Sequence, residues 1–197
     1  MKILAIGDLH GDIRQVSKLV KKAKDSNIDL ILLNGDFTLG DAHTYGLFKI
    51  LKEAKKPIIA LPGNHESLAT FEALVNKYGL INLHGYAAKF GEVGLFGCGG
   101  ADIGIFQLSE KEIYELLKHS FDYVKDCKKK IMVTHMHPSN VKVGTIFPGS
   151  KAIKKAIESF KPDIALCAHI HEASGLEDKI GNTKVLFVGK EGHIIEI

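Results

Sequence analysis

The stretch KILAIGDLH (residues 2–10) decides the fold of this chain. Its apolar run, Lys2–Ile6, predicts a β-strand, and Asp8 and His10 follow soon after the strand ends. The same pattern of an apolar run and then a polar cluster returns four more times. The later runs are Leu30–Leu33, Ile58–Leu61, Ile131–Thr134 and Asp163–Cys167, and the clusters after them are Gly35-Asp36, Gly63-Asn64-His65-Glu66, His135-Met136-His137 and His169-Ile170-His171. Because strand ends of an open α/β sheet face one crevice, we expect one convergent site.

Helix-like stretches separate the first three strands. Asp12 is a good N-cap for a helix whose apolar residues recur at helical spacing from Ile13 to Ala23. Tyr45, Leu47, Phe48, Ile50 and Leu51 fit a second helix, and Ser67 can cap a third that turns Phe71, Leu74 and Val75 inward. This alternation predicts a layered sheet flanked by helices.

The rest of the chain predicts further strands and helices. Leu80–Leu83, Tyr86–Phe90 and Val93–Phe96 are expected to be hairpin-connected strands, and Ser109 with Glu112 forms a capping box for a helix that reaches Cys127. Gly175–Ile180, Thr183–Val188 and His193–Ile197 are expected to be antiparallel strands, with a turn at Gly181-Asn182. The prediction is a single domain over residues 1–197 of the α/β class. Its architecture is a four-layer sandwich, in which two mixed β-sheets pack face to face with helices outside.

Composition limits the class of protein. The chain has 197 residues, 45% of them apolar, and a formal net charge of only +3, which gives no strong attraction to nucleic acid. The three cysteines lie far apart without a CxxC spacing, so we expect no disulfide framework. The first apolar run meets Asp8 at once, unlike a signal peptide, and no apolar stretch approaches the roughly 20 residues that span a bilayer. We therefore expect a cytoplasmic protein that does not bind membranes.

The clusters contain oxygen and nitrogen donors and no thiolate, which suits divalent metal ions. Alone, each is ambiguous: Asp36 could close a turn, and Pro62-Gly63-Asn64 is strong turn chemistry. His169 and His171 after an apolar strand are more informative, because a metal ion would satisfy both imidazoles. Five such clusters at strand ends argue against coincidence. His43, His84, His119 and His193 lie outside them, and we expect these to be surface or turn histidines.

In order and content the clusters resemble the calcineurin-like metallophosphoesterases. That family has Asp-x-His, Gly-Asp, Gly-Asn-His-Asp/Glu, a His and Gly-His-x-His, and the five blocks occur here from Asp8 to His171. The small size resembles the compact prokaryotic phosphodiesterase branch. Two departures are Ala168 in place of the last Gly, and no acidic residue or Arg directly after Gly35-Asp36. The missing Arg counts against protein phosphatase activity, and Asp41 is the nearest acidic substitute.

The resemblance implies particular roles. Asp8, His10 and His171 would hold one divalent ion, Asn64, His135 and His169 a second, and Asp36 would bridge them. His65 would donate a proton, and His137 is left as a possible substrate contact. The ions would be Mn, Fe, Ni, Co or Zn, with Mn favoured. The implied reaction is hydrolysis of a small phosphate ester, a diester rather than a monoester, by a hydroxide that two metal ions activate. Glu66 is expected to cap the following helix or to face water.

Alternatives stay open. A metal-dependent nuclease would use the same fold, although the low charge and the lack of an aromatic-basic stripe count against it. A non-catalytic metal-binding scaffold is the second alternative, and a redox or storage protein is the third. No Glu-rich helical di-iron pattern supports that third possibility. Specificity is expected from the loops Phe37–Tyr45, Gly97–Leu108 and His137–Pro148; the sequence names neither the substrate nor the oligomeric state.

Overall fold

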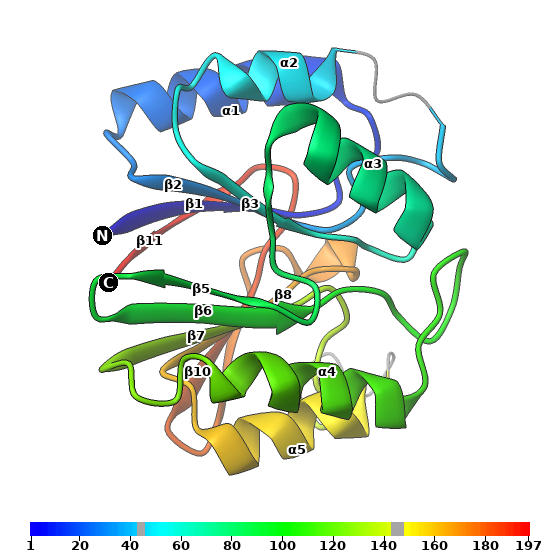
Figure 1. Cartoon of the computed structure of the whole chain (residues 1–197), viewed down its shortest axis with the longest axis vertical. Coiled ribbons are helices and arrows are strands. Elements are labelled where there is room, and N and C mark those ends of the chain that lie inside the picture. The colour runs from blue at the N-terminus through cyan, green and yellow to red at the C-terminus, as the bar shows by residue number, and fades with distance from the viewer. Residues whose placement is uncertain (43–45, 143–147) are drawn as a thin grey trace.

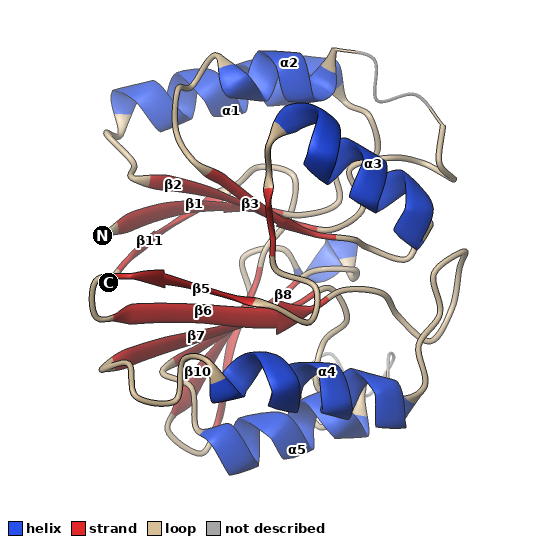
Figure 2. Cartoon of the chain, in the orientation of Figure 1, coloured by secondary structure: helices blue, strands red, loops and turns tan. Residues whose placement is uncertain are grey.

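A computed structural model of the chain describes residues 1–42, 46–142 and 148–197. The elements stack in four layers, with a helical layer on the outer face of each of two β-sheets (Figure 1). Helices α1 (Ile13–Asp25), α2 (Leu47–Lys52) and α3 (Leu68–Tyr78) cover one sheet, and α4 (Glu110–Asp122) and α5 (Lys151–Phe160) cover the other (Figure 2). The predicted α/β four-layer sandwich is confirmed.

The first sheet has five strands in the order β11-β1-β2-β3-β4. These are β1 (Lys2–Ile6), β2 (Leu30–Asn34), β3 (Ile58–Leu61), β4 (Ile81–Asn82) and β11 (His193–Glu196). Strands β1 to β4 are parallel, and β11 joins β1 antiparallel. Strands β2 and β3 are buried along their whole length, as expected for parallel strands with both faces covered.

The second sheet has six strands in the order β5-β6-β7-β8-β10-β9. These are β5 (Ala87–Phe90), β6 (Val93–Cys98), β7 (Lys129–Thr134), β8 (Ile164–Cys167), β9 (Glu177–Ile180) and β10 (Thr183–Phe187). The central strands β6, β7, β8 and β10 are parallel, while β5 and β9 pair antiparallel at the edges. Both sheets are therefore mixed, as predicted.

Three of the α-helices in the described residues, α1, α3 and α4, begin where the sequence places their caps. Asp12 and Ser67 cap α1 and α3 through their side chains, and Ser109 and Glu112 form the predicted capping box of α4. Tyr45, which was assigned to the second helix, lies outside the described residues.

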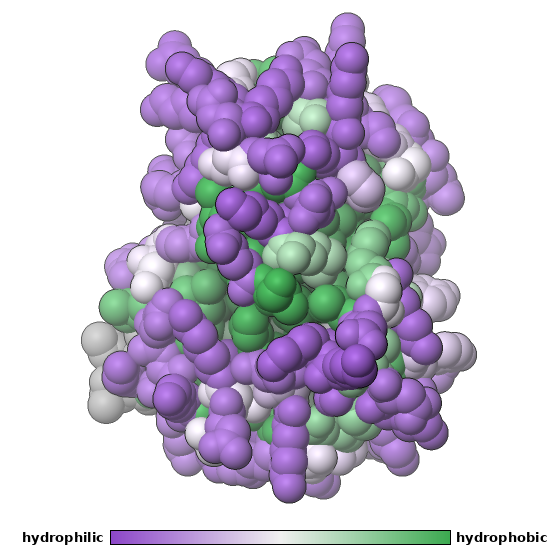
Figure 3. All heavy atoms as spheres, turned by 90° about the vertical axis from the view of Figure 1, so that its left-hand side faces the viewer, coloured by the Kyte–Doolittle hydropathy of each residue, from purple (hydrophilic) through white to green (hydrophobic). Residues whose placement is uncertain are grey.

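Three apolar clusters hold the layers together. One lies between the first sheet and its helices, one between the second sheet and its helices, and the third between the two sheets. Ile3, Leu32 and Ile59 from the first sheet meet Val133 and Leu166 from the second in that third cluster. On the face that carries both termini, apolar side chains form a band between more polar regions (Figure 3).

Two predictions were wrong, one about strand pairing and one about the length of a helix. Leu80–Leu83 does not pair in a hairpin with the next strand, because β4 lies parallel to β3 in the first sheet while β5 begins the second. Helix α4 ends at Asp122 and does not reach Cys127. Among the described residues, no helix has the length and apolar character needed to cross a membrane.

Candidate metal centre

The carboxyl ends of five strands meet at one edge of the sandwich. Loops after β1, β2 and β3 carry Asp8, His10, Asp36, Asn64 and His65, while His135 follows β7 and His169 and His171 follow β8. The strands belong to different sheets, so the site forms only when the two sheets pack together. All eight predicted site residues lie in the described part of the chain.

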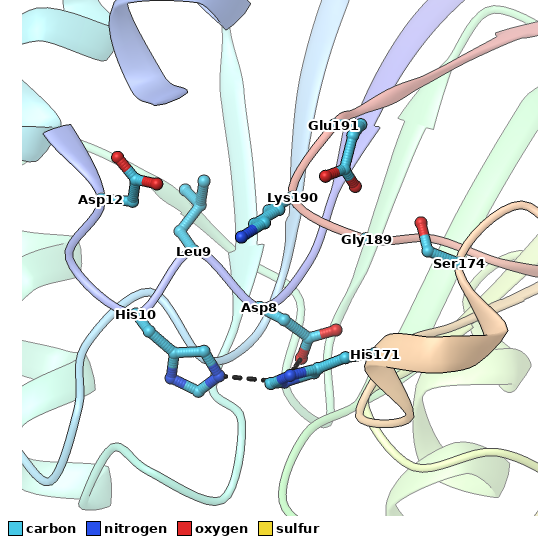
Figure 4. Close-up of a pocket in the computed structure, with 9 residues that line it drawn as sticks. All are labelled: Asp8, Leu9, His10, Asp12, His171, Ser174, Gly189, Lys190 and Glu191. Atoms are coloured by element: carbon cyan, nitrogen blue, oxygen red, sulfur yellow. Dashed lines mark hydrogen bonds and ion pairs between the residues drawn. The ribbon is translucent and has the colours of Figure 1, made fainter. Parts of the chain in front are cut away.

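Two groups of donor atoms form within this edge. One donor atom from each of Asp8, His10 and His171 lies within 4.8 Å of the others, and the same holds for Asp36, His135 and His169. In the first group the Nε2 atoms of His10 and His171 are 3.1 Å apart (Figure 4). Beside the second group, the Oδ1 atom of Asn64 lies 3.0 Å from Nε2 of His135.

Asp36 connects the two groups. Its Oδ2 atom lies 3.4 Å from Nε2 of His135 and 3.8 Å from Nε2 of His10. The same oxygen is 3.9 Å from Nε2 of His65, which makes His10, Asp36 and His65 a third group of suitable donors. One buried carboxylate thus reaches imidazoles on both sides of the site.

Backbone carbonyls orient two of the imidazoles. His10 Nδ1 donates to the Thr38 carbonyl at 3.1 Å, and His135 Nδ1 donates to the Asn34 carbonyl at 2.9 Å. The Nε2 atom of each ring is therefore directed into the site, where the neutral form of the imidazole could offer it to a metal ion. The arrangement is typical of metal-binding histidines, whose second nitrogen usually donates to a carbonyl or carboxylate.

Left-handed backbone conformations concentrate at the site. Asp8, His10, Asp36 and His169 have φ values of 53°, 43°, 51° and 70°. Such conformations are uncommon outside glycine and cost free energy unless the surroundings enforce them. Their concentration at one place indicates a functional constraint on these loops.

Glycine permits the loops to approach one another closely. A Cβ at Gly63 would overlap the Asp36 carboxylate, and a Cβ at Gly35 would meet His135 and the Gly63 backbone. The two loops after β2 and β3 can therefore come together only with glycine at both positions.

Glu66 joins the same two loops, and its expected role was wrong. The side chain is fully buried and does not face water, and the N-cap of α3 is Ser67. Its carboxylate accepts from the backbone N–H groups of Asp36, Thr38 and Gly63 at 2.7 to 3.0 Å and from the Thr38 hydroxyl at 2.8 Å. Glu66 therefore clamps the loop that carries Asp36 to the loop that carries Asn64.

Burial and close charges shift the pKa values of the site. Burial raises the pKa of Asp8 above its usual range. Burial also raises the pKa of Glu66, to about 7. Burial disfavours the charged forms of Asp36 and His135 as well, but their mutual attraction prevails: the pKa of Asp36 falls well below its usual range, and that of His135 rises to about 9. Burial and the neighbouring His135 lower the pKa of His169 to about 4.

The residues fit divalent metal ions. Buried within the site, the Oδ2 atom of Asp8 has no hydrogen-bond partner, although a buried carboxylate oxygen is costly to leave unpaired. The other oxygen, Oδ1, lies 3.9 Å from Nε2 of His171. The donors of the site are carboxylate, amide and imidazole groups. That donor set suits Mn, Fe, Co, Ni or Zn.

The remaining residues that the sequence singled out, Asp41 and the other histidines, lie in different surroundings. Asp41 accepts from the backbone N–H of Ser67 at 2.8 Å, so it supports the start of α3. His137 is buried and lines a cavity beside the centre. His84 is buried rather than at the surface, whereas His119 is exposed and His193 half-buried, and His43 lies outside the described residues.

Comparison with known proteins agrees with this geometry. The fold and the site define a protein that can bind metal ions at the strand ends of a two-sheet sandwich. A family model described as calcineurin-like phosphoesterase matches residues 1–173, and the chain belongs to that family. Membership supports a hydrolase that depends on divalent metal ions and acts on phosphate esters.

Three similar proteins illustrate the relationship. An uncharacterised protein of Methanocaldococcus jannaschii is 32% identical over 94% of this chain and 87% of its own. A crystal structure from Thermus thermophilus has a TM-score of 0.79 and 24% identity, covering 96% of this chain and 90% of that one. An archaeal phosphodiesterase has a TM-score of 0.58 and 16% identity, covering 96% and 84% of the two chains. The last two show likeness of fold.

Proposed function

We propose that this chain, as a single catalytic domain, hydrolyses phosphodiesters with two divalent metal ions. Asp8, His10 and His171 would hold one ion, and Asn64, His135 and His169 the other, with Asp36 between them. The observation that carries the proposal is the position of Asp36, whose Oδ2 atom lies within 4 Å of imidazoles in both groups. A carboxylate in this position can bind two cations and offset their mutual repulsion.

The chain's own residues would perform the remaining tasks. When bound, the metal ions supply Lewis acidity, which lowers the pKa of water and offsets charge on the phosphoryl group. His65 is about one-third exposed and lies beside Asp36, so its imidazole can reach both the carboxylate and a bound ester. As the imidazolium, it would protonate the leaving alkoxide. Glu66 would keep His65 and Asp36 at a fixed position relative to each other, because it holds their two loops together.

The preference for diesters and for Mn²⁺ is part of the proposal. An archaeal phosphodiesterase shares the fold, which supports diesters as substrates, and the mixed nitrogen and oxygen donors accept several ions of which we favour Mn²⁺. We also propose a cytoplasmic location, since Cys98, Cys127 and Cys167 are all free thiols.

Hydrolysis of an aryl phosphodiester by metal-stripped protein tests the reaction. Turnover should appear when Mn²⁺ is added and should exceed turnover of the matching monoester. The absence of turnover with any of Mn²⁺, Fe²⁺, Co²⁺, Ni²⁺ or Zn²⁺ would falsify the proposal.

The role of His65 has its own test. His65→Ala should slow hydrolysis of esters with poor leaving groups most, by about 10²- to 10⁴-fold, because those alkoxides need the proton. The variant should keep both metal ions. Loss of an ion from His65→Ala would instead make His65 a ligand, which its place in the third donor group allows.

A further inference from the structure

Two cavities of different character flank the proposed metal centre. The smaller, about 340 Å³, is bordered by Asp8, His10 and His171 and by polar side chains that include Lys190 and Glu191 (Figure 4). The larger, about 870 Å³, borders Asn64, His65, His169 and His171. Among the described residues, His171 alone lines both, so the cavities lie on two sides of the centre.

The larger cavity contains the proposed proton donor. His65 lines it and does not line the smaller cavity. A general acid must lie within reach of the oxygen that leaves, so the group attached to that oxygen would occupy the larger cavity.

Apolar side chains surround His65 on this side. Ile103, Met136 and Ile170 line the cavity, and Ile103 is 60% exposed. Ile105 and Leu39, which are 54% and 58% exposed, lie close by, since Ile105 approaches Gly40 next to Leu39. Large exposed apolar side chains grouped at the mouth of a site are typical of ligand contact.

The loop that carries Ile103 and Ile105 is fixed to the site. The backbone N–H groups of Ile105 and Phe106 both donate to the Asn64 carbonyl, at 2.8 and 3.2 Å. On the opposite side of His65, its carbonyl accepts from the Asp41 N–H at 3.0 Å. The apolar side chains are therefore held next to the proposed acid by backbone hydrogen bonds.

Beyond the imidazoles, the ionisable side chains that line the larger cavity in the described part of the chain are carboxylates. Asp102 and Glu172 line it, and its described lining includes neither Lys nor Arg. Lys190, by contrast, borders the smaller cavity. An anionic leaving group would meet two carboxylates with no lysine or arginine to offset them, which is unfavourable.

We propose that the larger cavity binds the leaving group of the ester, and that this group is apolar and carries no negative charge. Apolar alcohols of phosphoesters are the substrate class, and phosphorylated or carboxylated leaving groups are excluded. The inference rests on the proposed hydrolysis and on His65 as the acid, and it extends them to the identity of the ester.

A pair of substrates tests the charge preference. Methyl 4-nitrophenyl phosphate and methyl 3-carboxy-4-nitrophenyl phosphate have leaving groups of similar acidity and differ by one carboxylate. With Mn²⁺ present, kcat/KM should be about tenfold lower or more for the carboxylated ester. The ratio of kcat/KM for the uncharged leaving group to kcat/KM for the carboxylated one should become smaller at high salt, because exposed charges are screened.

Variants assign the effect to the cavity. Asp102→Asn and Glu172→Gln should each narrow the ratio by raising kcat/KM for the carboxylated ester. Asp126→Asn is the matched control, since Asp126 is exposed just before β7, at the end of the strand away from the site. It should leave the ratio unchanged. Ile103→Asn should raise KM for the neutral ester about fivefold, within the range for lost apolar contact.

The outcomes separate the two proposals. Equal kcat/KM values for the two esters, or a ratio that neither cavity variant alters, would overturn the leaving-group assignment alone. Failure to hydrolyse either ester with any divalent ion would overturn the proposed function, and this inference with it.

Discussion

The two sheets contribute unequally to the candidate metal centre. Loops of the five-stranded sheet supply every oxygen donor, from Asp8, Asp36 and Asn64, while loops of the six-stranded sheet supply only imidazoles, from His135, His169 and His171. Two of these loops, those that carry Asp36 and Asn64, are tied together by Glu66, whose carboxylate accepts four hydrogen bonds. The comparison shows that the carboxylates of the site come from one sheet, and that the other sheet contributes imidazoles placed against them.

Removing a ligand from each half should have different consequences. Asp36→Asn removes the carboxylate that reaches both groups, so both metal ions should be lost and kcat/KM should fall by roughly 10³-fold or more, about 4 kcal/mol of transition-state stabilisation. His171→Asn should release one ion, because His171 belongs to the first group alone. Metal content per chain, measured by mass spectrometry of the metals, distinguishes these results. Retention of both ions in Asp36→Asn would contradict the bridging role.

The rigidity of the oxygen-bearing half can be tested at Glu66. Glu66→Ala would leave three buried N–H groups and a hydroxyl without their acceptor, so we expect a loss of about 3 to 5 kcal/mol in the free energy of unfolding. Glu66→Gln keeps one acceptor oxygen and should cost less, about 2 kcal/mol. Urea denaturation measures both.

A control comes from the other half of the molecule. Glu112 forms the capping box of α4 at the surface, and Glu112→Ala should cost less than about 1 kcal/mol. A Glu66→Ala protein no less stable than this control would show that the clamp has little importance. The variant should also bind metal about 10- to 100-fold more weakly, because it loses support behind the ligands.

The parts that the sequence predicted are those with local signals. Apolar runs, caps and polar clusters recovered the four layers, the helix starts and the residues that meet at the strand ends. Glu66 was misread because a Glu just before a helix also suits its cap or its surface, and only the approach of the β2 loop shows why it is buried. The parallel pairing of β4 could not be predicted, since two residues carry no periodicity.

Long-range placement was equally beyond the sequence. Asp102, Glu172 and Ile103 lie in separate loops with no motif, and their meeting around one cavity depends on the packing of the two sheets. His84 had the same difficulty: its burial comes from the chain crossing between the sheets, which no spacing rule indicates.

The connection between β4 and β5, which links the two sheets, can be tested by its dependence on pH. His84 lies between β4 of one sheet and β5 of the other, and its Nδ1 accepts from the Gly99 N–H at 3.0 Å. Burial lowers the pKa of His84 from 6.5 to about 4. The pKa of His84 is lower in the folded state than in the unfolded chain. The contribution of neutral His84 to the free energy of unfolding is therefore fully present above about pH 6.5 and is lost as the pH falls toward 4. The loss is about 3 kcal/mol.

The matched variant is His84→Asn, whose amide oxygen can still accept from Gly99 but does not titrate. Between pH 7 and pH 4, the free energy of unfolding of the native protein should therefore fall by about 3 kcal/mol more than that of His84→Asn. Parallel pH profiles for the two proteins would show that His84 is protonated in the folded state as easily as in the unfolded chain.

The smallest effects compare helix caps in the two outer layers. Ser67 caps α3 on the five-stranded side, and Ser150 caps α5 on the six-stranded side. Ser150 is fully buried and its hydroxyl also donates to Glu110 of α4 at 2.9 Å, so its loss removes a second hydrogen bond besides the cap. Ser150→Ala should lower the free energy of unfolding by about 2 kcal/mol and Ser67→Ala by about 1 kcal/mol. Equal losses in urea denaturation would mean that the bond from the Ser150 hydroxyl to Glu110 adds nothing to stability, and that the backbone N–H groups of Lys151 and Ala152 already satisfy that carboxylate.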